Sequence, residues 1–496
     1  MNPHVDWHAL APDVVLTGTI IIVLLVDLLA PGRARWQSSR IAALGVLGAL
    51  VPVFTLGADG HNRLLFGGAY AVDNYALALK GFFLIVAYLT ILLSADYIAE
   101  GDYSQNEFYF LLLTAVLGMS IMASARDLIT LFVALETISI PTYVLAGYRK
   151  HDRRSNEAGI KYYLIGVLSS AVMLYGMSLI FGLTGATTLS GISHWIGTHH
   201  HAPALLTVAI FLSLVGFAFK VSAVPFHFWA PDTYDGAPTP VTAFLSVASK
   251  AGGFVAMLNI VFFGFGNDGK AWWWVIAILA ALSMTLGNLA ALRQTNLVRM
   301  LAYSSIAQGG FLLVPFAAYG IARTNDVRTS SFEATIVYLL IYGAMNLGAF
   351  AVLIAVARRT RSAEIDSYAG LFSTSPGLAV AMTIFLASLA GIPPLAGWYA
   401  KFVMFRAIIQ AGSSNHWAVV LAIIAAVNSV IAFFYYAGVI RQMWFREPAD
   451  GGGRVQTNLP PALGASIALT TAAVLVVGVY PELFARVGDL ATRFVS

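Results

Sequence analysis

Residues 204–226 read ALLTVAIFLSLVGFAFKVSAVPF, an apolar run that contains one lysine, Lys220, and one proline, Pro225. About 20 apolar residues are enough for a helix to cross the roughly 30 Å hydrocarbon core of a bilayer. A charge inside such a helix costs about 2.5 to 3.5 kcal/mol and usually faces a bundle interior or a water-filled path. Pro225 also removes the amide that would bond the carbonyl of Val221, so the run predicts a broken helix beside a buried cation.

The composition of the 496-residue chain places the rest of the sequence in the same class. Hydrophobic residues make up 59% and charged residues only 10%, whereas soluble chains carry about 25% charged residues. We therefore expect an all-α membrane protein that forms a single polytopic domain over 1–496, with about fourteen transmembrane helices. The apolar runs lie at 11–30, 40–57, 74–94, 107–125, 128–148, 159–183, 204–226, 238–263, 272–292, 298–319, 333–357, 376–410, 416–440 and 463–485.

The lysines and arginines of the loops are distributed unevenly. Most of them lie in the joins that follow odd-numbered runs, such as Arg149 and Lys150 after the fifth run. The positive-inside rule puts these joins in the cytoplasm. We therefore predict a bacterial inner membrane protein with both termini on the outer, periplasmic side.

Several kinds of chemistry are excluded or disfavoured. The chain has no cysteine, which excludes disulfides, thiolate nucleophiles and cysteine-held iron–sulfur clusters in this chain. It also has no phosphate-binding glycine loop and no Ser-His-Asp arrangement. We expect no metal site, no bound cofactor, no catalytic residue and no nucleic-acid partner on this chain.

Glu136 is the acidic residue nearest the centre of a predicted span. Ser139 and Tyr143 follow it by three and seven residues, so one helical face carries all three polar groups. A carboxylate in this position requires a cationic partner. We favour a titrating role for Glu136 over the alternative, a structural ion pair that only joins two helices.

The lysines within or close to predicted spans are candidates for proton exchange. Lys220 and Lys250 lie on successive helices, and desolvation favours the neutral form of a buried lysine. Lys161 lies near the start of the sixth run. Its position in the sequence therefore fits a side chain at the membrane interface as well as a buried one. Lys80 and Arg406 lie nearer span ends, where a long side chain snorkels to the interface.

A second proline break resembles the first. Pro393 and Pro394 free the carbonyls of Leu389 and Ala390, and Lys401 follows Pro394 by seven residues. Both breaks read Pro-x-x-x-Trp, as 225–229 and 394–398. We predict two inverted repeats, each with a discontinuous helix, over 107–263 and 272–441, a pattern that points to a transport site at mid-membrane. His227, beside the first break, either relays protons or has a structural role.

These motifs resemble those of the antiporter-like membrane subunits, a family that includes subunits of complex I and of multi-subunit cation/proton antiporters. The resemblance is carried by FKVSAVPFHFWAPD at 219–232, GAPTPV at 236–241, LET at 135–137, SKAG at 249–252, LAYSSI at 301–306 and PLAGW at 394–398. A lysine rather than a glutamate at position 401 is similar to the subunit N group and unlike the subunit M group.

The resemblance implies a fourteen-helix proton-translocating subunit in the membrane arm of NADH:quinone oxidoreductase. It implies that Glu136 pairs with Lys220, that Lys250 is central, that Lys401 faces the exit half-channel, and that Lys161 and His227 belong to the polar axis. Flavin (FMN) and iron–sulfur clusters would lie in partner subunits, and subunits M and K would be neighbours. The alternatives are a subunit of a cation/proton antiporter or membrane-bound hydrogenase, and a structural membrane scaffold.

Overall fold

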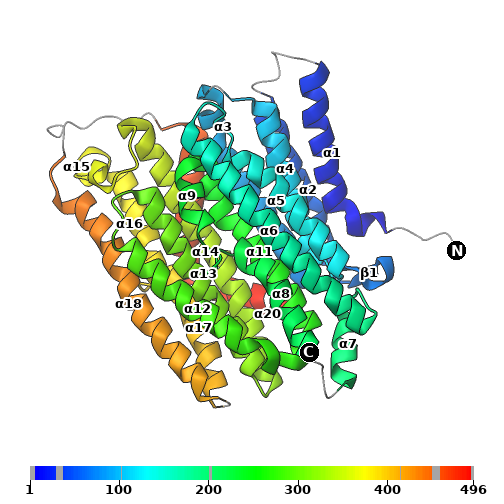
Figure 1. Cartoon of the computed structure of the whole chain (residues 1–496). Coiled ribbons are helices and arrows are strands. Elements are labelled where there is room, and N and C mark those ends of the chain that lie inside the picture. Colours follow the sequence, from blue (N-terminus) through cyan, green and yellow to red (C-terminus); the bar gives the residue numbers. More distant parts are fainter. Residues whose placement is uncertain are drawn as a thin grey trace. The chain divides into compact units, whose positions relative to one another are not determined.

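The computed structural model describes residues 6–29, 37–101, 103–199, 204–413, 415–448 and 459–492 (Figure 1). In these ranges the chain is helical apart from one short hairpin, in which strand β1 (Arg63–Leu65) pairs antiparallel with β2 (Tyr70–Val72). The predicted all-α membrane class is therefore confirmed. Both chain ends, whose side of the membrane was predicted, lie outside the described residues.

The predicted spans coincide in position with helices, although fewer helices than the predicted fourteen are long and apolar enough to cross a membrane in the described ranges. Within the described ranges, twelve helical segments are long and apolar enough to cross a membrane, and two shorter apolar helices, α8 (Ala204–Lys220) and α16 (Pro376–Ala390), accompany them. Each predicted apolar run has a counterpart among these helices. The main differences are at the two breaks, where the run 204–226 ends as a helix at Lys220 and the run 376–410 divides into α16 and α17 (Ala396–Gly412).

The chain divides into two compact units, which are described separately. The first comprises residues 1–221, 236–238 and 248–272. Its elements besides the hairpin and α8 are α1 (Trp7–Leu29), α2 (Ser38–Asp59), η2 (Phe66–Gly68), α3 (Asn74–Glu100), α4 (Gln105–Ser124), α5 (Leu128–Ala146), α6 (Arg153–Thr184), α7 (Leu189–Thr198), α11 (Lys250–Leu258), η4 (Asn259–Gly264) and η5 (Gly266–Asp268).

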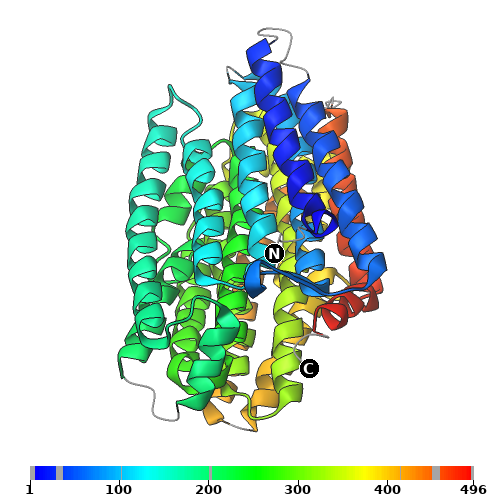
Figure 2. The same cartoon turned by 90° about the vertical axis from the view of Figure 1, so that its right-hand side faces the viewer.

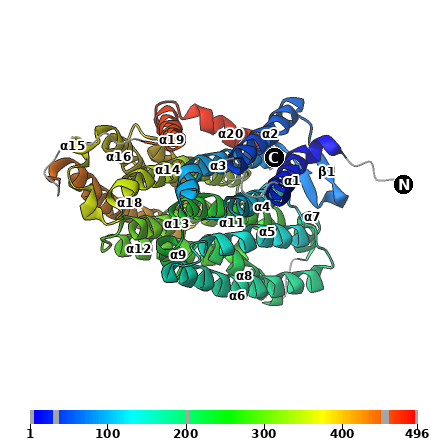
Figure 3. The same ribbon diagram turned by 90° about the horizontal axis from the view of Figure 1, so that it is seen from above.

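Within this unit the helices pack in neighbouring pairs. Helices α1 and α2 run side by side (Figure 2), and α6 lies along α8 (Figure 3). Aspartates start three of the helices by accepting bonds from backbone amides: Asp73 before α3, Asp127 before α5 and Asp152 before α6. Such N-caps satisfy amides that have no partner within the helix.

Two buried ion pairs join the helices of the first unit. The ammonium of Lys80 lies 2.9 Å from Asp13 and also bonds Tyr70 and Ser120. Its side chain is 0% exposed, so the prediction that Lys80 snorkels to the interface is wrong. Asp13 was overlooked as its partner because the two residues are far apart in sequence. In the second pair, Arg126 lies 3.0 Å from Asp73 and stacks on Phe263.

The second unit comprises residues 222–235, 239–247 and 273–496. Its elements, some of which continue into the first unit, are α9 (Trp229–Gly236), α10 (Thr239–Phe244), η3 (Leu245–Ser249), α12 (Gly269–Ala291), α13 (Leu297–Ile321), α14 (Asn325–Thr360), η6 (Ile365–Tyr368), α15 (Leu371–Thr374), α16, α17, α18 (His416–Phe445), α19 (Pro461–Val479) and α20 (Glu482–Thr492). Helix α14 packs on α13, α16, α17, α19 and α20, so it lies at the centre of this unit.

Candidate functional site

Lys220 is the last residue of α8, and its side chain points into the first unit. Its ammonium donates hydrogen bonds to the hydroxyls of Ser139 on α5 and Tyr162 on α6, both at 3.0 Å. Lys220 is 1% exposed. The rings of Tyr162 and Tyr143 lie 5.5 and 5.9 Å from the ammonium and stabilise its charge through their π faces. Lys220 is therefore buried among neutral groups.

Glu136 lies on α5, one turn before Ser139. It is half-buried, and its Oε1 atom has no hydrogen-bond partner in the described part of the chain. Among the described residues, Glu136 and Lys220 do not form an ion pair within 4 Å, although the resemblance implied one. Ser139 and Tyr143, the residues predicted to share its face, both contact Lys220. The direct pairing of Glu136 with Lys220 stays a prediction.

Tyr162 was not found from the sequence. Its hydroxyl completes the site because it accepts the second hydrogen bond from Lys220. It follows Lys161 directly and lies on a helix with many aromatic and apolar residues. The sequence offered no signal that distinguishes it from its neighbour Tyr163, whose side chain is exposed.

Lys250 is the first residue of α11 and is 1% exposed. The other residues of this helix are buried too. The π-helix η3 precedes it directly, and a second π-helix, η4, follows α11. A π-helix bonds residues five apart, and such turns are frequent at functional sites. The structure thus places Lys250 in a fully buried helix between two irregular turns.

Lys161 occupies a different environment from Lys220 and Lys250. It lies near the start of α6, and its side chain is 41% exposed. Its ammonium is 2.6 Å from Glu157, one turn earlier on the same helix. Its participation in a proton path stays a prediction.

His227 lies in the irregular segment between α8 and α9. It is 4% exposed, and its Nδ1 atom has no hydrogen-bond partner within the described ranges. Pro225 and the neighbouring turns keep this segment out of a helix, as predicted. The structure leaves open both the relay role and the structural role of this histidine.

Lys401 lies on α17 in the second unit and is 7% exposed. Its ammonium donates a 2.7 Å hydrogen bond to the carbonyl of Ala390, the last residue of α16, and lies 5.0 Å from the Phe311 ring. Pro394 has no amide to bond that carbonyl, as the sequence predicted. Lys401 therefore binds an oxygen atom that the break makes available.

The neighbouring carbonyl, of Leu389, is bonded by a residue that the sequence analysis missed. Gln308 on α13 donates to it at 3.1 Å and accepts a 2.6 Å bond from the Tyr338 hydroxyl. Gln308 is 1% exposed. A buried glutamine surrounded by small and apolar residues could have been found in the same way as the lysines, because burying its amide is also costly.

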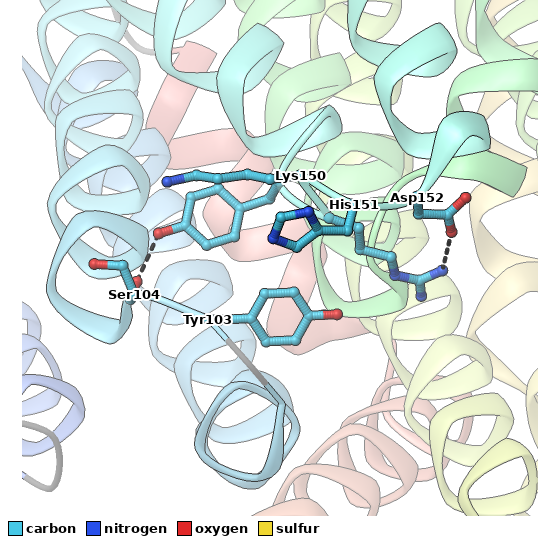
Figure 4. Close-up of a pocket in the computed structure, with 7 residues that line it drawn as sticks. Tyr103, Ser104, Lys150, His151 and Asp152 are labelled. Carbon is cyan, nitrogen blue, oxygen red and sulfur yellow. Dashed lines mark hydrogen bonds and ion pairs between the residues drawn. The ribbon is translucent and has the colours of Figure 1, made fainter.

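A surface cavity of about 370 Å³ lies elsewhere in the first unit (Figure 4). It is lined by Tyr103, Ser104, Tyr148, Arg149, Lys150, His151 and Asp152. Burial raises the pKa of Tyr148, whose hydroxyl donates to the carbonyl of Ser104 at 2.6 Å. None of the predicted site residues lines this cavity. Within the described ranges, no group of three or more His, Asp or Glu side chains is placed to hold a metal ion.

The fold and the buried lysines define the class of protein when they are compared with known proteins. A family model described as NADH:quinone oxidoreductase/Mrp antiporter, TM matches residues 125–431, which include Glu136, Lys220, Lys250 and Lys401. The chain belongs to this family of antiporter-like membrane proteins.

Within the family, the chain is similar over almost its whole length to NADH-quinone oxidoreductase subunit N of Trichlorobacter lovleyi. The two are 38% identical over 493 residues, which cover 99% of this chain and 98% of that protein. The NAD(P)H-quinone oxidoreductase subunit 2 of Synechococcus elongatus is 42% identical over 440 residues, which cover 88% and 81% of the two chains.

Solved structures show the same fold. A chain of respiratory complex I from Thermus thermophilus with bound aureothin matches with a TM-score of 0.78 and 30% identity, covering 96% of this chain and 98% of that one. A chain of the Mrp complex from Dietzia matches with a TM-score of 0.83 and 21% identity, covering 98% and 97%. At that identity the likeness to the Mrp chain shows the fold alone.

Proposed function

We propose that this chain is a proton-translocating membrane-arm subunit of an NADH:quinone oxidoreductase. The first unit would use Glu136, Lys220 and Lys250, with Lys161 and His227 as further members, and the second would use Lys401. The proposal is supported by the likeness to subunit N of such enzymes and by the environments of Lys220 and Lys401. One observation carries it: both of these buried ammonium groups are bonded to neutral oxygen atoms.

The contrast with Lys80 explains why this observation matters. Lys80 is held by the carboxylate of Asp13, so its deprotonation would leave a buried carboxylate without its counter-charge. Lys220 and Lys401 are bonded to hydroxyls and to a carbonyl, and within the described residues neither is in an ion pair. Either can therefore become neutral without leaving an uncompensated charge, which is the requirement for a group that passes a proton on.

The chain would act as a non-catalytic subunit of the translocase. NADH oxidation and quinone reduction, together with FMN and the iron–sulfur clusters, would lie in partner subunits. The neighbours in the membrane arm would be subunits M and K. The chain would lie in a bacterial inner membrane with both termini on the periplasmic side, which is supported by the excess of arginine and lysine in alternate joins.

Two alternative functions lead to different experimental results. A subunit of a cation/proton antiporter or a membrane-bound hydrogenase would use the same lysines in a complex with other partners. Purification of the native complex and identification of its subunits distinguishes these cases: co-purification with NADH-oxidising and quinone-reducing subunits supports the proposal, and co-purification with antiporter subunits overturns it. If the chain were a structural scaffold, Lys250→Met would damage only assembly and leave pumping by the assembled complex intact, whereas we expect that variant to assemble and lose pumping.

A further inference from the structure

The aliphatic stem of Lys220 lies directly on a glycine. A Cβ atom built on Gly253 of α11 would lie 2.9 Å from Cγ and 3.0 Å from Cβ of Lys220, and 3.2 Å from a methyl group of Val221. Real Cβ atoms almost never approach other atoms so closely, because protein interiors are already close-packed. Only a hydrogen atom at position 253 leaves room for the lysine stem in this position.

A second glycine, Gly166, packs against the ring of Tyr143, which contacts the ammonium of Lys220. A Cβ atom on Gly166 of α6 would collide with the hydroxyl of Tyr143 and lie 2.6 Å from its Cζ atom. The Tyr143 ring meets the Tyr162 ring edge to face at 4.6 Å, and its centroid is 5.9 Å from the ammonium of Lys220. Gly166 therefore sets the position of one wall of the Lys220 site.

We propose that Gly166 and Gly253 are positioning residues for Lys220, which hold its ammonium on Ser139 and Tyr162. This inference rests on the proposed role of Lys220 in proton transfer. With a methyl group at position 253, the stem must shift away from α11 and the two 3.0 Å bonds must stretch or break. With a methyl group at position 166, Tyr143 must leave its present position against Tyr162, the hydrogen-bond acceptor of Lys220.

The backbone gives no other reason for glycine at these positions. Both residues lie inside α-helices, and neither is among the glycines with positive φ. Glycine is a poor helix former compared with alanine. Alanine therefore favours each helix itself, so a loss of function in these variants cannot be ascribed to a weakened helix.

The test compares three glycine-to-alanine variants of the full chain in the assembled complex. Gly166→Ala and Gly253→Ala place a methyl group against the Lys220 site. Gly182→Ala is the matched control, because Gly182 also lies in α6 but has open space where its Cβ would be. The measurement is protons pumped per electron transferred to quinone, in reconstituted vesicles. We expect the ratio to fall about fivefold or more in the first two variants, as overpacking predicts, and to stay unchanged in the control.

A second-site change separates positioning from general packing. Tyr143→Phe removes the hydroxyl that lies closest to a new methyl group at position 166, and this hydroxyl has no hydrogen-bond partner in the described part of the chain. Added to Gly166→Ala, it should restore part of the lost pumping. Added to Gly253→Ala, it should restore none, because the obstruction there is the lysine stem.

Lys220→Ala in the same assay distinguishes failure of this inference from failure of the proposed function. Normal pumping by Lys220→Ala would overturn the proposed function itself. Reduced pumping by Lys220→Ala, with normal pumping by assembled Gly166→Ala and Gly253→Ala, would overturn only the positioning role. Failure of both alanine variants to assemble would also overturn it, because the glycines would then serve helix packing rather than the placement of Lys220.

Discussion

Lys401 is buried, and its ammonium group is bonded to a neutral backbone carbonyl rather than to a carboxylate. Its ammonium bonds only the carbonyl of Ala390 among the described residues and lies against the Phe311 ring. A neutral carbonyl that loses this bond is left with no net charge, so the loss costs less than leaving a buried carboxylate without its counter-charge. The residue is therefore suited to alternate between charged and neutral forms.

We predict that Lys401→Arg fails as Lys401→Ala does. Arginine keeps the positive charge and can still donate to the carbonyl, but its guanidinium does not deprotonate in proteins. Proton pumping by the assembled, reconstituted complex should fall on the order of tenfold or more in both variants, as expected for loss of a proton-transfer group. Arg406→Lys, a charge-conserving change on the same helix in a residue paired with Glu333 at 2.8 Å, is the control and should pump normally. Normal pumping by Lys401→Arg would show that Lys401 does not titrate.

The buried pair of Lys80 and Asp13 leads to a prediction about stability. Lys80→Met leaves the carboxylate of Asp13 buried without its counter-charge, and breaking such a pair costs about 3 to 5 kcal/mol. The double variant with Asp13→Asn removes the uncompensated charge and should recover most of the loss. Thermal unfolding of the purified complex measures both effects. Equal destabilisation in the single and double variants would contradict the coupling of the two charges.

At this scale the sequence predicted the charged members of the site but not their partners. Lysine or glutamate in an apolar run is conspicuous, because burying a charge is costly whatever surrounds it. Tyr162 is an ordinary residue whose importance comes only from the neighbours that the fold brings to it. The sequence predicted that the carbonyl of Ala390 is free, but not that Lys401 bonds it. The exposure of Lys80 was predicted wrongly for the same reason. The sequence shows how far Lys80 lies from the end of its span, but it does not show that Lys80 pairs with Asp13.

The two helices that end at the proline breaks, α8 and α16, are the distinctive elements of this chain. The first stops at Lys220, and the second stops at Ala390, where Gly391 adopts a left-handed conformation with φ of +93°. Proline positions predicted both breaks, but not the residue at which each helix ends. Helix α8 ends five residues before Pro225, because the turns that follow Lys220 are already irregular.

We predict that the double variant Pro393→Ala with Pro394→Ala lowers pumping. Amides at these positions could bond the carbonyls of Leu389 and Ala390, and would then compete with Gln308 and Lys401 for them. Protons pumped per electron should fall several-fold, about the effect of 1 kcal/mol or more on Lys401 placement. Pro52→Ala, in the unbroken helix α2, is the matched control. Unchanged pumping in the assembled double variant would remove the carbonyls of this break from the mechanism.

For the whole chain, the sequence predicted the class, the positions of the spans and the family, because each rests on patterns repeated along the entire length. The two inverted repeats over 107–263 and 272–441 stay a prediction. The units seen in the structure have interleaved boundaries, with residues 222–235 and 239–247 in the second unit and 236–238 in the first. These interleaved boundaries depend on tertiary packing. The periodicity of a sequence does not predict such packing.

The proposed function requires proton transfer in this chain to be coupled to quinone reduction in other subunits. If Lys220 and Glu136 take part in one proton path, and if each redox turnover requires that path to operate, then blocking the path should also slow the redox reaction. We therefore predict that Glu136→Gln and Lys220→Ala each lower proton pumping and quinone reduction together. Glu107→Gln, which removes an exposed carboxylate 3.4 Å from Lys150 and outside the proposed path, should change neither rate and serves as the control.

The two rates are measured in the same vesicles, with and without an ionophore that dissipates the proton gradient. An ionophore relieves inhibition by the gradient but cannot restore a missing proton carrier, so quinone reduction in the variants should stay low. The double variant should be no slower than the more affected single variant, because two residues that act in one path lose the same step. Additive losses in the double variant would assign Glu136 and Lys220 to separate paths, and normal pumping by the assembled double variant would exclude both residues from proton transfer.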